Sequence, residues 1–170
     1  MAKSRNGARD WGEPLWQGRA PARAPAALPR TIDVIIVGGG LTGISTALHL
    51  ARAGVRVVVF EAATLGDGAS GRTGGIVLEG TATGVRPGAD NCVPSLARLV
   101  EEFAIDCELH LPGCWEIEHQ LGVGSSALPW SDDGSPIRIA RTVAGGSVEP
   151  RALLFGLADA AQRSGATIKE

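Results

Sequence analysis

The chain has 170 residues, of which 44% are hydrophobic and 20% charged, a composition that excludes a disordered or fibrous protein. Lysine and arginine number 16 against 18 aspartate and glutamate, so the formal charge is −2 and no broad basic surface is available for nucleic acid. The chain has no run of about 18 apolar residues, so we expect no membrane span. The first 30 residues lack the apolar core of a secretory signal, and the 3 cysteines form no C-x-x-C pair, so we expect reduced thiols and a cytoplasmic protein.

Residues 1–30 are rich in proline, alanine and arginine and show no hydrophobic period. This pattern predicts a flexible amino-terminal arm that precedes a domain over residues 31–170. Trp11 and Trp16 could anchor the arm against the domain, or they could belong to a tail that binds other surfaces non-specifically; the sequence leaves both interpretations open.

The domain opens with a strand, a glycine-rich turn, a helix and a second strand. The run from Ile32 to Val37 is β-branched and nearly continuous, which predicts a strand buried on both faces, as in a parallel sheet. A second such run extends from Val55 to Phe60, and Gly54 is placed to end the helix between them. Together they predict a right-handed βαβ unit. The apolar face of its helix consists of Leu41, Ile44, Ala47, Leu48 and Ala51.

The later elements are a mixture of helices and strands. Residues 65–84 have too little periodicity for an assignment, whereas residues 114–119 and 136–143 alternate as a pair of half-buried strands, with Trp115 and Ile117 inward. A strand is also expected at 166–168. One helix is expected near Pro94 and another from Pro150 to a cap at Gly165. Their apolar faces are Leu96, Leu99, Val100, Phe103 and Cys107 for the first, and Leu153, Leu154, Leu157 and Ala161 for the second.

The glycine turn after the first strand carries the strongest chemical signal. Residues 38–43 read G-G-G-L-T-G and fit G-x-G-x-x-G between a strand and a helix. In that pattern Gly38 permits the tight turn, Gly40 lets a pyrophosphate approach the backbone, and Gly43 lets the helix pack closely on the strand. The free N–H groups and the dipole at the helix start then favour phosphate. The turn therefore predicts a dinucleotide site.

Glu61 supplies the second element of this site. It stands at the end of the second strand, where a carboxylate accepts hydrogen bonds from a ribose diol. A carboxylate also repels a 2′-phosphate, so a cofactor of the NADP type is disfavoured. These features alone do not separate NAD from FAD.

A second glycine-rich loop, G-A-S-G-R-T-G-G at residues 68–75, makes that distinction by resemblance. It is similar to the flavin-contacting motif of the D-amino acid oxidase family of FAD-dependent oxidoreductases, which includes glycine, sarcosine and gamma-glutamylputrescine oxidases. Relatives with this pattern usually carry Asn where this chain has Thr73. The resemblance covers about residues 30–170 and is strongest over 33–75. It implies an α/β fold in which a Rossmann-like FAD-binding domain with a parallel sheet precedes the beginning of an incomplete substrate domain.

The resemblance also implies the chemistry. FAD is the expected cofactor, a small-molecule amine or amino acid is the expected substrate, and a hydride passes from the carbon beside nitrogen to the flavin. No catalytic residue can be named. No metal is expected, because the spacing of the cysteines and histidines over 107–119 matches no familiar zinc pattern. The expected cofactor-binding residues are Gly38, Gly39, Gly40, Leu41, Thr42, Gly43, Glu61, Ala62, Ala69, Ser70, Arg72, Thr73, Gly74 and Gly75.

The sequence leaves two other classes of function open. The chain resembles an amino-terminal portion of such an enzyme, so the isolated 170 residues are expected to show no turnover and to self-associate or need a complementing chain. A non-catalytic module that binds FAD or a nucleotide is one alternative. An NAD-dependent dehydrogenase is another, although it leaves the 68–75 loop unexplained.

Overall fold

The computed structural model describes residues 27–79, 91–119 and 137–170, so most of the expected arm, including Trp11 and Trp16, lies outside the described residues. The chain divides into two compact units. The first combines residues 1–73 with 150–170, and the second comprises residues 74–149. The third helix and the last strand therefore belong with the βαβ segment, from which they are distant in sequence. None of the described helices is both long and apolar enough to cross a membrane.

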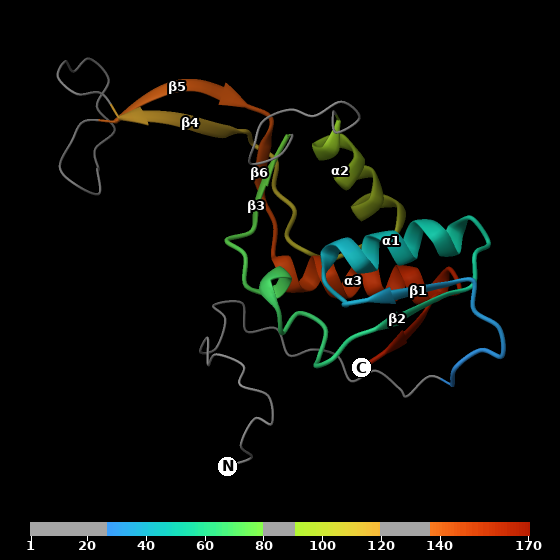
Figure 1. Ribbon diagram of the computed structural model, residues 1–170. Helices are drawn as coiled ribbons and strands as arrows, with labels where there is room; N and C mark the ends of the chain where they lie inside the picture. The colour runs from blue at the N-terminus through green and yellow to red at the C-terminus, as the bar shows by residue number, and fades with distance from the viewer. Residues whose placement is uncertain (1–26, 80–90, 120–136) are drawn as a thin grey trace, which may run out of the picture. The chain divides into compact units, whose positions relative to one another are not determined.

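A three-stranded parallel sheet forms the base of the first unit (Figure 1). Its strands are β1 (Val34–Val37), β2 (Val57–Phe60) and β7 (Thr167–Lys169), in the order β1-β2-β7. The register places Val34 beside Val57, and Val58 beside Thr167. The predicted α/β fold with a parallel sheet is confirmed.

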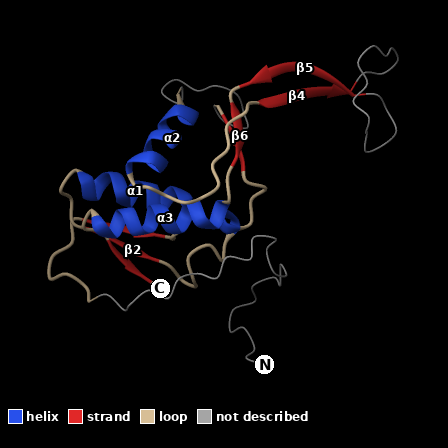
Figure 2. Cartoon of the chain, turned by 180° about the vertical axis from the view of Figure 1, so that it is seen from behind, coloured by secondary structure: helices blue, strands red, loops and turns tan. Residues whose placement is uncertain are grey.

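Two helices cover one face of this sheet. Figures 1 and 2 show α1 (Leu41–Arg52) and α3 (Pro150–Arg163) side by side on the same face. Gly54 and Gly165, with φ of +79° and +105°, follow the two helices as predicted. The apolar positions expected to face inward are buried, apart from half-buried Leu41: Ile44, Ala47, Leu48, Ala51, Leu153, Leu154, Leu157 and Ala161.

The prediction that the first strand is buried on both faces is wrong. Ile35 and Val37 are 58% and 88% exposed, whereas Val58 in β2 is completely buried. The reason is the place of β1 in the sheet: among the described residues it is an edge strand, whereas β2 lies between β1 and β7, so Val58 is buried although it pairs with Ile35 and faces the same side. Ile36, on the other face of β1, packs toward α1 near Gly43. Side chains of a strand alternate between faces, so every second residue of β1 is open to solvent.

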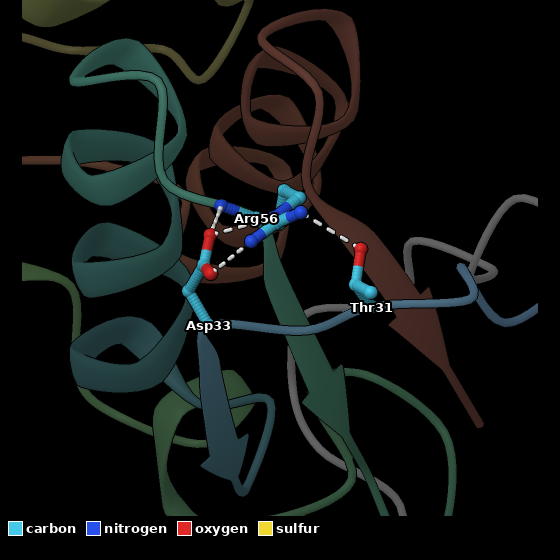
Figure 3. A network of polar contacts seen from close by, with 3 residues as sticks. All are labelled: Thr31, Asp33 and Arg56. Carbon is cyan, nitrogen blue, oxygen red and sulfur yellow. Dashed lines mark hydrogen bonds and ion pairs between the residues drawn. The ribbon is translucent and has the colours of Figure 1, made fainter.

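At the amino ends of β1 and β2, an exposed polar network joins three residues (Figure 3). The carboxylate of Asp33 accepts hydrogen bonds from the backbone N–H of Arg56 at 3.0 Å and from its Nε at 2.8 Å, and it forms an ion pair with Nη2. Nη1 of Arg56 donates to Oγ1 of Thr31 at 2.8 Å. The side chain of Arg56, followed by its backbone N–H, lowers the pKa of Asp33 from 3.8 to about 2.

The described residues of the second unit form one helix and two small antiparallel sheets. The helix is α2 (Cys92–Glu102); one sheet pairs β3 (Ile76–Leu78) with β6 (Gly145–Ser147), and the other pairs β4 (Cys114–His119) with β5 (Ile137–Val143). The β4–β5 pair confirms the two strands expected from their alternating pattern. Strand β3 comes from the segment whose sequence showed no usable period.

Two expectations for this unit are wrong in detail. The face predicted for α2 extended to Cys107, but the helix ends at Glu102, and both Ala104 and Glu108 have positive φ, which breaks the helical path. Cys107 is nevertheless buried, and burial raises the pKa of its thiol. Trp115 was expected to face inward but is 59% exposed, because β4 pairs only with β5 in a two-stranded sheet among the described residues.

Candidate functional site

The glycine turn lies between the end of β1 and the start of α1. Gly38 has a φ of +101°, a conformation that favours glycine, and its N–H donates to the carbonyl oxygen of Phe60 at 2.7 Å. A Cβ on Gly43 would lie 2.1 Å from the carbonyl oxygen of Gly38 and 3.2 Å from Cγ2 of Ile36. Helix and turn are therefore closer than any side chain at residue 43 would allow, which is the packing that the G-x-G-x-x-G pattern predicts.

The carboxylate of Glu61 accepts two backbone N–H groups, one of which belongs to the glycine turn. Its Oε2 accepts the N–H of Gly39 at 2.7 Å, and its Oε1 accepts the N–H of Ala63 at 3.0 Å. The N–H of Glu61 itself donates to the carbonyl oxygen of Lys169 at 2.7 Å, which extends the pairing of β2 with β7. A carboxylate has about four acceptor positions, so two remain for hydroxyl groups. The sequence predicted the location of Glu61 but not its bond to Gly39.

The second glycine-rich loop reaches the same place through Ser70. This residue lies in the short 3₁₀ helix η1 (Ala69–Gly71), and its Oγ accepts the N–H of Leu41, the first residue of α1, at 3.0 Å. A Cβ on Gly40 would lie 2.8 Å from the same Oγ. The loop is itself tightly folded, because a Cβ on Gly71 would lie 2.1 Å from the carbonyl oxygen of Gly66. The structure thus brings Ser70 to the start of α1.

The other residues expected in the second loop are placed differently. Arg72 is half-buried, and its Nε donates to the carbonyl oxygen of Asp67 at 2.9 Å. Gly74 and Gly75 belong to the second unit, where the carbonyl oxygen of Gly75 accepts the N–H of Val148 at 2.8 Å. Their approach to a flavin stays a prediction. The remaining expected residues are exposed: Thr42, Ala62, Ala69 and Thr73.

Sequence reasoning missed Leu65, which packs next to Gly39 of the turn, and Glu170, which bonds to Leu65. Leu65 is completely buried, and its Cδ2 lies 2.2 Å from the position that a Cβ on Gly39 would occupy. The N–H of Leu65 donates to Oε1 of Glu170 at 2.8 Å. The two residues are 105 positions apart, so no local pattern links them.

This arrangement fits the ADP half of a dinucleotide. Among the described residues, no atom outside the neighbouring positions lies within 4 Å of a Cβ placed on Gly38, so this side of the turn has room for a ligand. The first N–H groups of an α-helix lack intrahelical acceptors and suit a diphosphate, and the oriented carboxylate of Glu61 suits a ribose diol. Over the residues that the structure describes, no group of three or more His, Cys, Asp or Glu side chains is arranged to hold a metal ion.

Comparison with known proteins assigns the family. Residues 33–170 match the family model described as FAD dependent oxidoreductase (DAO). The gamma-glutamylputrescine oxidoreductase of Escherichia coli is 67% identical over 45 residues, which are 26% of this chain and 11% of that protein. A glycine oxidase of Pseudomonas aeruginosa is 33% identical over 106 residues, covering 58% of this chain and 29% of that protein.

The fold agrees with this assignment. The structure of an L-amino acid deaminase from Proteus myxofaciens aligns over 90% of this chain and 41% of its own, with a TM-score of 0.64 and 21% identity. In each of these comparisons, the chain spans less than half of the related protein. The match over most of its length shows that the chain belongs to the DAO family of FAD-dependent oxidoreductases, whose cofactor is FAD.

Proposed function

We propose that the first unit binds the ADP half of FAD at residues 38–43, and that Glu61 receives the ribose hydroxyls. The observation that carries this proposal is the 2.7 Å bond from the N–H of Gly39 to Oε2 of Glu61, which orients the carboxylate beside the turn before any ligand arrives. The start of α1 supplies N–H groups for the diphosphate, and the hydroxyl of Ser70 lies at that start, where it can donate to a phosphate oxygen.

The finer part of the proposal is that the protein oxidises an amine or an amino acid. FAD supplies the chemistry when bound, by accepting a hydride from the carbon beside the substrate nitrogen. The chain's own residues bind and orient this cofactor: Arg72, Thr73, Gly74 and Gly75 are proposed for its flavin side. The second unit is proposed as the beginning of the substrate domain. Support for the substrate class comes from the related proteins, which are named for gamma-glutamylputrescine, glycine and L-amino acids.

Titration with FAD and with NAD tests the binding proposal. We expect a visible flavin band to co-purify with the protein or to develop on titration, and we expect no comparable affinity for NAD. Gly40→Val should abolish this binding. Gly40 has a φ of −75°, which valine can adopt, but a Cβ there would lie 2.8 Å from Oγ of Ser70, so the substitution displaces this hydroxyl from the start of α1 without requiring a strained backbone.

Glu101→Ala is the control, because it changes an exposed side chain at the end of α2 in the other unit. Tight NAD binding without flavin, or equal FAD affinity in the Gly40→Val protein, would contradict the assigned site. The substrate class needs a separate measurement, on a protein of its relatives' length that contains this chain. Anaerobic bleaching of the flavin band by amines or amino acids is expected; bleaching by 2-hydroxy acids alone would overturn the substrate class.

A further inference from the structure

We propose that Glu170 is a positioning residue for the nucleotide site: it holds the segment 61–65 in place and, through Leu65, the glycine turn. The inference rests on the proposed function, since it concerns the same site. Its basis is the hydrogen bond from the N–H of Leu65 to Oε1 of Glu170, at 2.8 Å and partly buried. Glu170 does not belong to the turn, to the helix that follows it, or to the second glycine-rich loop.

The sheet register explains how Glu170 comes to this position. Phe60 in β2 pairs with Lys169 in β7, and the N–H of Glu61 donates to the carbonyl oxygen of Lys169 at 2.7 Å. Glu61 and Glu170 therefore follow paired residues at the carboxyl ends of neighbouring parallel strands. Within the described residues, neither carboxylate forms an ion pair with a lysine or arginine. Both accept backbone N–H groups instead.

Together the two carboxylates hold alternate residues of one short segment. Glu61 accepts the N–H of Ala63 at 3.0 Å, and Glu170 accepts the N–H of Leu65 at 2.8 Å. This segment leaves β2 and must turn within a few residues, where backbone N–H groups have no neighbouring strand to bond. The hydrogen bond to Glu170 is charge-assisted, which makes it stronger than a bond between neutral groups.

Leu65 transmits this constraint to the turn. Its side chain is completely buried, and its Cδ2 lies 2.2 Å from the position of an added Cβ on Gly39. Gly39 in turn donates its N–H to Glu61. If the N–H of Leu65 lost its acceptor, the segment and the side chain beneath Gly39 would be free to shift, and the carboxylate of Glu61 would lose its fixed direction. Glu170 thereby sets the geometry of a site that it does not itself form.

The test compares Glu170→Ala with Glu170→Gln, which keeps an oxygen acceptor at the same position. Glu101→Ala is the control, because it removes an exposed carboxylate from the end of α2 in the other unit. Amide hydrogen exchange of Leu65 and Gly39 is followed by NMR in the protein without FAD, and FAD is then titrated. For E170A we expect exchange of both amides to accelerate, and the FAD dissociation constant to rise, by about three- to tenfold. E101A should stay within twofold of the original protein, and E170Q, which keeps an acceptor oxygen but loses the charge, should show a smaller effect than E170A.

A merely structural role would give a different result. If E170A accelerates exchange at Leu65 but leaves both Gly39 and the FAD affinity unchanged, or if exchange in the core of β2 accelerates equally, the positioning role is overturned. An E170Q protein that behaves like E170A would also overturn it, because the acceptor atom would then not be what matters. Failure of the unsubstituted protein to bind FAD would refute the proposed function instead, and the exchange of Gly39 would still decide whether Glu170 holds the turn.

Discussion

At both ends of the parallel sheet a carboxylate accepts a backbone N–H that adjoins the neighbouring strand, but the two carboxylates have different surroundings. At the amino end, Asp33 accepts the backbone N–H of Arg56, which crosses from β1 to β2. At the carboxyl end, Glu61 accepts the backbone N–H of Gly39, which crosses between the same two strands in the opposite sense. In each case, a carboxylate adjoining one strand bonds to the backbone adjoining its neighbour.

The difference lies in what else each carboxylate meets. The guanidinium of Arg56 occupies both oxygens of Asp33, holds its pKa near 2 and leaves a neutral, exposed pair. Glu61 receives only backbone N–H groups among the described residues, so its charge and part of its acceptor capacity remain for a ligand. The comparison shows why the amino end serves strand register, whereas the carboxyl end suits the hydroxyls of a ribose, in keeping with ligand binding at the carboxyl ends of parallel strands.

The largest effect is expected from the glycine that brings helix and turn together. In Gly43→Ala, the new Cβ would lie 2.1 Å from the carbonyl oxygen of Gly38, a backbone atom that cannot move without displacing the turn. We expect a loss of about 3 kcal/mol in the free energy of unfolding, measured by urea denaturation, together with loss of FAD binding. Glu101→Ala changes an exposed side chain at the end of α2 and should leave both unchanged. A G43A protein as stable as this control would show that the close approach is not required.

Removing each of the two carboxylates in a separate variant tests the comparison directly. Glu61→Ala removes the acceptor for the N–H of Gly39 and the acceptor that we propose for the ribose, and should weaken FAD binding by about 1–3 kcal/mol. Asp33→Ala removes the corresponding group at the other end of the sheet and should leave the FAD dissociation constant within twofold. Both constants come from the same fluorescence titration. Equal weakening by the two substitutions would mean that carboxylates at both ends act only through the stability of the sheet.

A smaller effect is expected from Ser70→Ala. The hydroxyl accepts the N–H of Leu41, and its removal leaves the start of α1 with one acceptor fewer. We expect FAD binding to weaken by about 1 kcal/mol and the amide of Leu41 to exchange faster, because a neutral hydrogen bond contributes less than one to a charged group. Ser70→Thr keeps the hydroxyl and should restore both. If Ser70→Thr restores neither FAD binding nor the slow exchange, loss of the hydrogen bond to Leu41 is not the cause of the weaker binding.

The smallest effect concerns the pH dependence of the amino end. Because Asp33 has its pKa lowered from 3.8 to about 2, its ion pair stabilises the folded protein above pH 3.8. That contribution is lost as the pH falls from 3.8 toward 2. The stability difference between the original protein and Asp33→Asn should therefore be constant near neutral pH, shrink over this acid range, and diminish with added salt. A difference that is undiminished at pH 2 would assign it to packing rather than to charge.

Much of the first unit could be predicted, because the sequence patterns that indicate its helices and strands are local. A β-branched run, a glycine turn and apolar residues at helical spacing succeed one another over residues 32–60, so neighbouring residues suffice to determine the βαβ order. The same holds for α3, whose apolar face and terminal Gly165 lie within one short segment. The position of Glu61 follows from strand length alone. Resemblance of the 68–75 loop then pointed to FAD, and the family match confirms it.

Other features depended on which segments come together. Nothing within residues 32–37 reveals that β1 lies at the edge of the sheet that the described residues form, so exposure of Ile35 and Val37 was not foreseen. The end of α2 is followed by Ala104, whose φ is positive, and β3 pairs with β6, which is remote in sequence. Leu65 and Glu170 meet across 105 positions. Periodicity along the chain and the glycine motif thus predicted the βαβ unit, α3 and the position of the turn. The edge position of β1, the pairing of β3 with β6 and the contact of Leu65 with Glu170 were decided by tertiary structure, because each requires partners that are remote in sequence.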